Sequence, residues 1–541
     1  MRRILHIPNR LRPSGLRKVI AVAVGTGILL TGLTGTAHAE TATPATTEDP
    51  IVIRSFDGTP LVARMMLPIR ATATTKVPAI LMTHGWGGSR PTGTADTLDD
   101  VIIRKLLDAG YGVLTWDSRG FGQSGGQASP AGPAEVADAR ALIDYLATRP
   151  EIIQDKAGDP RVGWTGGSNA AGIQFNTAAA DRRIDAIAPF AGWGNLNQDL
   201  WPNGAVKTTW WNLLFGTGSS GSLTGGLISP AGVQLGALDP HATQAYAETT
   251  LTGEPSTTSR AWFDARSTVR HSGSITAPTL IVQGTIDTLF PLEDGLANYQ
   301  NLLAAGTPVK FMAMCFGHTV IGCSYGPTGD DRDATTGQVL WQQRIIDWMD
   351  RYVKKDASVK TGPQVEWQAN DGKYYGATKF PLAGTTAITG LPVTTGLLAG
   401  PGGTGGDGPT NGAPAADTEL GVTAARSTVL APSSSPRAIF GVPSVRVSGT
   451  AFGLSAQIHM ELIDRAPDGT RVTVDDQTMP WRFAGLLDQN IDLHAVAWRL
   501  EPGHALELEI STGSAQYEAP RTGPFTVDLK AVTKLPVTPM S

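Results

Sequence analysis

The sequence has little charge and almost no cysteine, and after its N-terminal region it lacks a long apolar run. Only 17% of its 541 residues are charged and two are cysteines, whereas about 25% of an average globular chain is charged. Beyond residue 39, no segment approaches the roughly 20 apolar residues of a membrane-spanning helix. Lys and Arg number 43, against 48 Asp and Glu. Since nucleic-acid binding depends on Lys and Arg contacts with phosphates, nucleic acid is excluded as the main partner.

Glycine is abundant instead. The chain holds 64 glycines and 37 prolines, and glycine thus makes up about 12% where about 7% is usual. Low charge with much Gly, Ala, Thr and Ser is typical of a compact, loop-rich chain and not of a disordered or coiled one. At about 150 residues per domain, the length predicts three or four domain-sized units.

The first 39 residues have the pattern of an export signal. They hold six basic residues and no acidic one, an apolar run of 15 residues (19–33), and an A-x-A cleavage site that ends at Ala39. We expect a signal peptide at 1–39 with cleavage near Ala39. The secreted mature chain would have 37 basic and 48 acidic residues, a net charge of −11. An uncleaved membrane anchor is the alternative, and the arginine pair at 2–3 leaves both the general and the twin-arginine export routes open.

Between residues 50 and 355, short apolar runs alternate with helical periodicity. Strands that are apolar on both faces and alternate with helices predict an α/β domain with a parallel sheet over 50–355. The expected helices cover residues 98–109, 136–146 and 341–352, and the expected strands cover 51–56, 61–67, 77–84, 111–117, 161–166, 185–193, 277–284 and 308–315.

One stretch, at about 194–276, interrupts this alternation. It lacks the strand–helix rhythm and carries four tryptophans, at positions 201, 210, 211 and 262. The pattern indicates a packed excursion with an aromatic core, a cap that forms an apolar wall over the active site, or both.

Residues 361–541 change to an alternation of apolar and polar positions, with turns such as the Pro-Asp-Gly at 467–469. This alternation predicts a C-terminal all-β domain, a sandwich or jelly roll. The Gly- and Pro-rich stretch at about 400–417 inside it is expected to be a flexible insertion.

Two serines compete for the role of nucleophile. Residues 122–126 match the pattern G-x-S-x-G around Ser124, but no helix begins directly behind them. Ser168 lies in GGSNA, between the strand expected at 161–166 and the helical stretch AAGIQFNTAAA. Such a tight strand–turn–helix lifts a serine hydroxyl above the sheet. We therefore predict Ser168 as the nucleophile and Ser124 as a turn residue.

The partners of the nucleophile follow in the chain order Ser, acid, His. Asp287 and His318 each come just after an expected strand. Ser168 would attack an acyl carbon, His318 would take and return the proton, and Asp287 would fix the imidazole tautomer. Glu293 and Asp294 are reserve acids that look like the start of a helix.

Two backbone N–H groups, those of Trp86 and Asn169, are candidates for an oxyanion hole. Asn169 directly follows the nucleophile, and Trp86 lies in the HGWGG loop at 84–88, where glycines let the backbone approach a developing oxyanion. The alternative for this loop is a structural turn. Arg119, in DSRGFG, is expected to tie loops together.

The motifs HGWGGS, DSRGFGQS, GGSNAAG, GTIDTLFP and FGH together resemble the α/β-hydrolase superfamily. The segments LIDRAPDGTRV and WRLEPGHALELEIS resemble the C-terminal jelly roll of the Xaa-Pro dipeptidyl-peptidase (peptidase S15) and cocaine-esterase-like family. The resemblance covers nearly all of the mature chain. It implies an α/β-hydrolase fold with a cap, a jelly-roll domain, and a serine hydrolase whose triad is Ser168, Asp287 and His318. Asn169 stands where the family usually has Tyr, and Trp86 lacks the hydroxyl that the family often uses, so the oxyanion hole is expected to use backbone donors.

We expect a secreted serine hydrolase that forms an acyl-enzyme on a small-molecule ester or an Xaa-Pro-type peptide. No metal, other cofactor or stable membrane span is expected, and the oligomeric state is left open. A peptidase needs a carboxylate for the free amine of its substrate, and four cap residues are candidates for it: Asp199, Asp239, Glu248 and Asp264. The alternative function is a non-catalytic or weakly catalytic protein that binds a polymer or the cell wall on the same fold.

The two cysteines, Cys315 and Cys323, flank His318. In an oxidising compartment an even pair most simply forms a disulfide, which would hold the His318 loop in place. Two free thiols are the alternative, and a metal site lacks further Cys or His ligands at suitable spacing.

Overall fold

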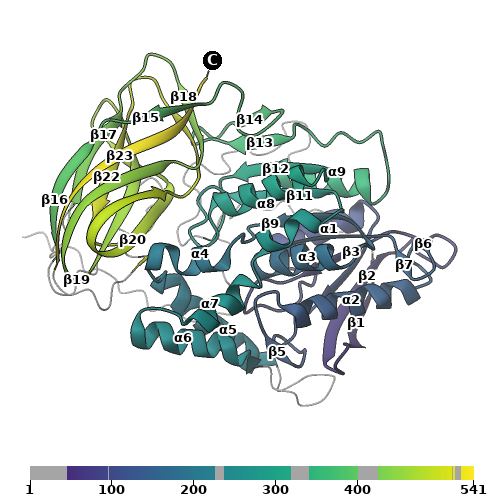
Figure 1. Ribbon diagram of the computed structural model, residues 1–541. Helices are drawn as coiled ribbons and strands as arrows, with labels where there is room; N and C mark the ends of the chain where they lie inside the picture. Colours follow the sequence, from purple (N-terminus) through teal and green to yellow (C-terminus); the bar gives the residue numbers. More distant parts are fainter. Residues whose placement is uncertain are drawn as a thin grey trace, which may run out of the picture.

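The computed structural model describes residues 45–95, 97–225, 237–318, 340–399, 424–514, 516–517 and 525–540 (Figure 1). The signal peptide expected at 1–39, the insertion expected at 400–417 and Cys323 lie outside the described residues. Within those residues, no helix combines the length and the apolar character that crossing a membrane requires.

The N-terminal domain is built on a ten-stranded sheet in the order β1-β2-β4-β3-β8-β9-β11-β12-β13-β14. Neighbouring strands from β4 to β13 pair in parallel. The pairs β1–β2, β2–β4 and β13–β14 are antiparallel, so the prediction of a parallel sheet is wrong at both edges. The link between β1 and β2, residues 55–59, is too short for the crossover that a parallel pair needs.

The eight expected strands are all present, and β13 and β14 are added to them. The strands of this sheet are β1 (Ala45–Arg54), β2 (Pro60–Pro68), β3 (Ala79–Thr83), β4 (Gly112–Trp116), β8 (Val162–Gly167), β9 (Ile184–Phe190), β11 (Thr279–Gly284), β12 (Val309–Met314), β13 (Val365–Gln368) and β14 (Tyr374–Ala377). Two short pairs stand apart from it: β5 (Gln127–Ala128) with β10 (Ala237–Leu238), and β6 (Gln154–Lys156) with β7 (Asp159–Pro160).

Helices cover both faces of this sheet (Figure 1). Side chains alternate between the faces, as a period of two requires: Leu81 packs in the core under α2, α3 and α8, whereas Ile80 and Met82 pack in the core under α1 and α9. The side chain of Thr97 caps the start of α1 by accepting the N–H of Asp100. The helices are α1 (Leu98–Asp108), α2 (Pro133–Thr148), α3 (Asn169–Ala180), α8 (Leu292–Ala304) and α9 (Leu340–Tyr352).

The stretch without strand–helix rhythm is a helical cap between β9 and β11. Its helices are α4 (Leu196–Leu200), α5 (Thr208–Gly225), α6 (Pro240–Thr252) and α7 (Thr257–Asp264). Trp201, Trp211 and Phe263 pack edge to face, with ring centroids 4.9–5.8 Å apart. The aromatic residues of this region thus form a core of their own, which holds the cap helices together.

The remaining strands form a C-terminal all-β region in which every strand pair is antiparallel. Along β23, buried positions alternate with exposed ones, so one face packs on a core and the other faces solvent. The strands are β15 (Thr386–Thr389), β16 (Val393–Ala399), β17 (Ala424–Leu430), β18 (Arg437–Gly441), β19 (Ser444–Arg465), β20 (Arg471–Asp492), β21 (Val496–Leu500), β22 (Ala505–Ser511) and β23 (Phe525–Pro539).

The chain completes the first sheet before it begins the β region. The sequence places the change of domain at 355–361, but β13 pairs in parallel with β12, with Val365 opposite Phe311, and β14 pairs with β13. Trp367 of β13 is buried and packs against Phe440 of β18, with ring centroids 5.4 Å apart. At four residues each, β13 and β14 are too short for a recognisable alternation, so the pattern does not reveal them.

The packing of α3 against the loop after β9 is tight enough to test. A Cβ at Gly172 would lie 2.1 Å from the ring of Trp193, so Gly172→Ala is expected to lower the free energy of unfolding by about 1–3 kcal/mol. Gly216→Ala is the matched control, because Gly216 lies on an exposed part of α5 and an added Cβ would meet nothing within 4 Å. Urea unfolding should show no loss for the control; equal losses for both variants would contradict this packing.

Candidate active site

Ser168 occupies a strained turn between β8 and α3. Its φ is 58° and its ψ is −124°, a region that costs a non-glycine residue of order 1–3 kcal/mol. The backbone N–H of Ser168 donates to the carbonyl of Phe190 at 3.1 Å. A Cβ at Gly167 would lie 2.2 Å from the ring of the same phenylalanine, so only glycine fits there. Close packing on β9 therefore enforces the turn that the sequence predicts for a nucleophile.

Ser124, the formal match to the G-x-S-x-G pattern, has a structural environment. Its hydroxyl donates to the carbonyl of Asp117 at 2.7 Å and accepts the N–H of Val62 at 2.8 Å. The residue is 1% exposed. These bonds join the loop after β4 to β2, which agrees with the prediction that Ser124 is a turn residue.

Asp287 and His318 are brought together at the ends of β11 and β12. The Nδ1 atom of His318 lies 2.8 Å from Oδ2 of Asp287, and both side chains are completely buried. Oδ1 of Asp287 accepts the N–H groups of Leu289 and Phe290 at 3.0 and 2.8 Å. The Nε2 atom of His318 has no hydrogen-bond partner among the described residues. One imidazole nitrogen is thus fixed by a carboxylate, and the other is free for a proton transfer.

The two reserve acids serve other partners. Glu293 accepts from His494 at 2.6 Å and from the N–H of Ala495 at 2.8 Å, which ties the start of α8 to the β region. Asp294 hydrogen-bonds through its carboxyl group with Asp199 of the cap. Both acids lie in the first turn of α8, as the sequence predicts.

Two residues that the sequence does not single out support the loop after Asp287. Lys207 of the cap is completely buried, and its Nζ donates to the carbonyls of Thr288 and Leu289 at 2.9 and 3.2 Å. Gln477 of β20 donates through Nε2 to the carbonyls of Thr285 and Asp287 at 3.0 and 3.1 Å. A lone lysine among tryptophans, in AVKTTWW, is the one signal that could have drawn attention to Lys207; Gln477 has none.

Burial shifts the pKa values of three residues that lie behind the loop after Asp287, namely Asp199, Asp294 and Lys207. It raises the pKa of Asp199 well above its usual range, and the neighbouring Asp294 raises it further. Burial and the charge of Glu293 raise the pKa of Asp294 to about 8, while burial lowers the pKa of Lys207. Burial thus disfavours the charged forms of both the Asp199 and the Asp294 carboxyl group. Asp199 is buried against Asp294 and therefore does not offer a free carboxylate to a substrate.

The HGWGG loop after β3 lies against the nucleophile. A Cβ at Gly85 would lie 3.6 Å from Cβ of Ser168. The Nε2 atom of His84 accepts the N–H of Ser118 at 3.0 Å, so Nδ1 carries the proton and donates to the carbonyl of Gly85 at 2.7 Å. Burial lowers the pKa of His84, which keeps the ring neutral. The histidine is thus a fixed spacer under the loop that carries Trp86.

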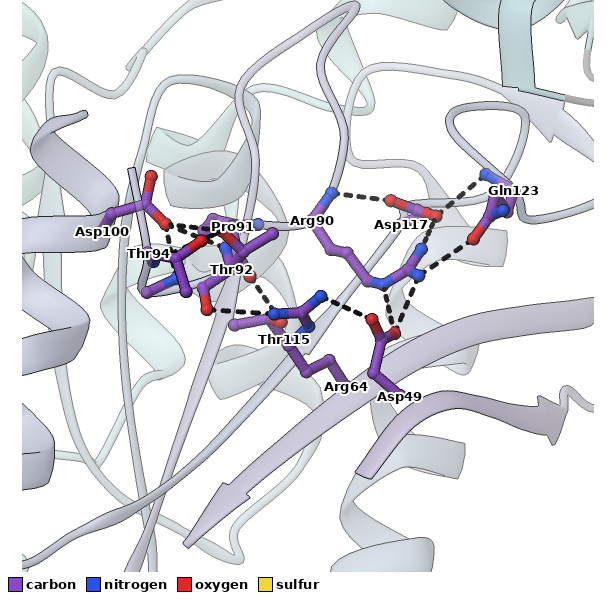
Figure 2. A network of polar contacts seen from close by, with 11 residues as sticks. Asp49, Arg64, Arg90, Pro91, Thr92, Thr94, Asp100, Thr115, Asp117 and Gln123 are labelled. Carbon is purple, nitrogen blue, oxygen red and sulfur yellow. Dashed lines mark hydrogen bonds and ion pairs between the residues drawn. The ribbon is translucent and has the colours of Figure 1, made fainter. Parts of the chain in front are cut away.

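A network centred on Asp117 anchors the far end of the same loop. Figure 2 shows Arg90 between Asp49 and Asp117. The backbone N–H and the guanidinium of Arg90 both donate to the Asp117 carboxylate, at 2.6 and 2.5 Å, and its other arm reaches Gln123 at 2.9 Å. Arg119 makes a bidentate contact with Asp138 and so ties loops together, as the sequence predicts.

A cavity lies over Ser168 and is partly open to solvent; the empty space there, open solvent included, is about 590 Å³. Apart from Ser168 and Asn169, its described lining is apolar. The lining residues are Trp86, Pro130, Ser168, Asn169, Trp193, Leu196, Leu200, Trp211, Leu214, Phe215, Leu238, Ala242, Phe263 and Phe290. The cap supplies most of them, so it is both a packed excursion and a wall over the site. The described residues contain no cluster of His, Cys, Asp and Glu suited to a metal ion.

The two residues named for the oxyanion hole lie in this cavity with Ser168. Asn169 is the first residue of α3, where the N–H has no acceptor inside the helix. The indole N–H of Trp86 donates to the carbonyl of Leu214 at 2.8 Å, which fixes the ring and leaves the backbone N–H as the candidate donor. Cys315 is buried just beyond β12, and its expected pairing stays a prediction because Cys323 lies outside the described residues.

Comparisons by sequence point to one family. Residues 57–322 match the family model described as X-Pro dipeptidyl-peptidase (S15 family). Over 113 residues the chain is 32% identical to an uncharacterized 31.7 kDa protein of Escherichia coli from the traX-finO intergenic region. That match covers 21% of this chain and only 36% of the length of the Escherichia coli protein.

Solved structures share the fold over most of the chain. They include an aminopeptidase from a marine sediment archaeon, Thaumarchaeota archaeon (14% identity, TM-score 0.63, 93% of this chain and 98% of that one). A CocE/NonD family hydrolase from Staphylococcus aureus is similar (14% identity, TM-score 0.63, 91% of this chain and 94% of that one). An α-amino acid ester hydrolase is similar as well (14% identity, TM-score 0.67, 93% of this chain and 98% of that one). At this identity the likeness establishes the fold and not the substrate.

The contact between Gln477 and the Asp287 loop gives a testable consequence. Gln477→Met keeps the side-chain length but leaves two buried carbonyls without a donor, which should cost about 1–3 kcal/mol of stability. Since a displacement of about 1 Å at a catalytic group can cost about a hundredfold, we expect kcat on a chromogenic ester to fall about ten- to a hundredfold with little change in KM. Gln489→Met, at an exposed position of the same strand, is the control. Unchanged kcat in a folded Gln477→Met variant would show that this contact does not position the site.

Proposed function

We propose, from the premise that residues 57–322 of this hydrolase belong to the X-Pro dipeptidyl-peptidase (S15) family, that the protein is a serine hydrolase that cleaves an ester or amide. Ser168, His318 and Asp287 are the proposed triad. The observations that carry the proposal are the buried Asp287–His318 pair with its free Nε2 atom and the strained turn that holds Ser168. His318 packs edge-on against Phe290, which lines the same cavity as Ser168.

The geometry supports the following steps. Ser168 Oγ forms a bond to the acyl carbon while His318 Nε2 takes its proton, and the proton then passes to the leaving group as the bond to that group breaks. Water attacks the resulting acyl-enzyme with the same histidine as base, which returns the carboxylic acid and the serine. Asp287 accepts the hydrogen bond from the Nδ1–H group throughout and stabilises the imidazolium. The backbone N–H groups of Trp86 and Asn169 are proposed to bind the oxyanion, each worth about a hundred- to a thousandfold in kcat.

The remaining expectations fit this proposal. We propose that the signal peptide is removed by cleavage near Ala39 and that the enzyme is secreted. The C-terminal β region would be a jelly roll, and the contacts described between this region and the site are structural. Gln477 supports the acid loop, and Glu293 holds His494.

The triad predicts opposite results for the two candidate serines. Ser168→Ala should lower kcat/KM on p-nitrophenyl acyl esters by about four to six orders of magnitude and abolish labelling by a fluorophosphonate probe. Ser124→Ala should keep the label and most of the activity, with a loss of stability of about 1–3 kcal/mol from the two buried bonds. Circular dichroism checks that both variants fold. A native protein that takes no label and has no hydrolase activity would instead favour a binding protein on this fold.

The disulfide gives a separate prediction for the exported protein. Non-reducing peptide mapping should show Cys315 linked to Cys323, a nine-residue loop whose closure is worth about 2–3 kcal/mol. Because this loop carries His318, mild reduction should lower turnover before the protein unfolds. Full activity after complete reduction would leave the bond with a role in stability only, and free thiols in the map would contradict the pairing.

A further inference from the structure

We infer that the acyl group accepted by this site is uncharged and mainly apolar, and that an acyl group with a free α-ammonium is rejected. The inference rests on the proposed function, because it names the substrate class of the Ser168 site. It goes against a reading of the site as a dipeptidyl-peptidase, which would have to hold the free amine of a dipeptide.

The walls of the cavity are apolar, and the tryptophan N–H groups in them are already engaged. Three tryptophans face the cavity, and the protein itself accepts the indole N–H of each. Trp86 donates to the carbonyl of Leu214 at 2.8 Å, Trp193 to the carbonyl of Arg266 at 3.0 Å, and Trp211 to the hydroxyl of Thr249 at 2.7 Å. These rings therefore offer apolar surface to a substrate and no hydrogen-bond donor.

Among the lining residues that the structure describes, one polar side chain besides Ser168 remains, and it is neutral. Asn169 lines the cavity and is 2% exposed, and neither Oδ1 nor Nδ2 has a hydrogen-bond partner in the described part of the chain. A buried amide without a partner is costly, so a substrate that hydrogen-bonds Asn169 gains affinity. A single amide oxygen does not replace a carboxylate as the partner of an ammonium group.

The four cap carboxylates considered as partners for an amine are used elsewhere. None of the four cap acids named from the sequence lines the cavity, and each has a partner within the protein. Asp199 is buried against Asp294, Asp239 caps α6 and contacts His241, Glu248 accepts from Gln244, Ser256 and Ser259, and Asp264 pairs with Arg270.

The consequence for a charged substrate follows from desolvation. An ammonium that moves from water into an apolar cavity loses its hydration, and without an anionic partner the loss is not offset. In this site the penalty is expected to lower kcat/KM at least about a hundredfold. A phenyl or alkyl group of similar size instead gains from burial against tryptophan and leucine.

Three p-nitrophenyl esters separate charge from size in the native enzyme: those of 3-phenylpropanoate, phenylalanine and N-acetylphenylalanine. The second differs from the first by an α-ammonium, and acetylation removes that charge while adding bulk. Each kcat/KM is divided by the rate of hydroxide hydrolysis, because the ammonium activates the ester chemically. We expect the phenylalanyl ester to be at least about a hundredfold worse than the 3-phenylpropanoyl ester near pH 6, and the N-acetyl ester to lie nearer the latter. Since an α-amino group loses its charge near pH 7.7–8, the gap should narrow as the pH approaches about 8.5.

A variant can supply the missing carboxylate. Leu214 lines the cavity and is half-buried, so Leu214→Glu should narrow the gap between the two esters at pH 6 about tenfold or more. Leu213→Glu is the matched control, because Leu213 is 41% exposed and lies outside the lining; the gap should stay as in the native enzyme. If Leu214→Glu fails to fold, the three esters on the native enzyme still decide the question.

The outcomes distinguish this inference from the proposed function. A preference for the phenylalanyl ester, or efficient cleavage of Gly-Pro and Ala-Pro p-nitroanilides, by an enzyme that a fluorophosphonate labels at Ser168 would overturn the inference and keep the hydrolase. Absence of both labelling and ester hydrolysis would overturn the proposed function itself. An equal rate for charged and neutral esters would show that the acyl group does not enter the cavity and would also overturn the inference.

Discussion

The buried carboxylate of Asp287 sets the requirement that much of the surrounding structure meets. A carboxylate without exposure is tolerated only when its oxygens are paired. One oxygen of Asp287 takes the imidazole of His318 and the other takes two backbone N–H groups. Those N–H groups belong to a loop that must not move, and it is held from the cap by Lys207 and from the β region by Gln477. Three parts of the chain thus converge on one side chain.

How far the sequence predicts this protein depends on how local the cause of each feature is. The turn at Ser168 follows from glycines and a helix within a few residues of it, and Asp287 and His318 follow their strands directly. These features could be assigned from pattern and are brought together by the parallel sheet. The contact of Lys207 with Thr288 spans 81 residues and that of Gln477 with Asp287 spans 190. Sequence spacing does not predict contacts over such separations. A four-residue strand such as β13 is also too short to show a recognisable alternation of apolar and polar residues.

The cap divides its polar and apolar residues between two tasks. Trp211, Phe263 and four leucines of the cap form part of the wall over Ser168, and the indole N–H of Trp211 is satisfied by the hydroxyl of Thr249. Its charged residues Asp199 and Lys207 instead point into the interior beside α8 and the Asp287 loop. A single insertion therefore lines the cavity and supports the loop that follows Asp287. Substitutions of cap residues that line the cavity are thus expected to change substrate specificity, whereas substitutions of Asp199 or Lys207 are expected to change turnover.

The return of the chain to the first sheet through β13 and β14 has a consequence for biosynthesis. Chains are made from the N-terminus, and the sheet that carries the site is complete only when residues 365–377 have been added to it. The carbonyl of Asp287 receives its last donor only when Gln477 exists. A nascent chain that has passed His318 therefore already contains every residue of the proposed triad, yet lacks the parts that hold their geometry. Under the proposed function, full activity would therefore require a chain that has been synthesised at least as far as Gln477.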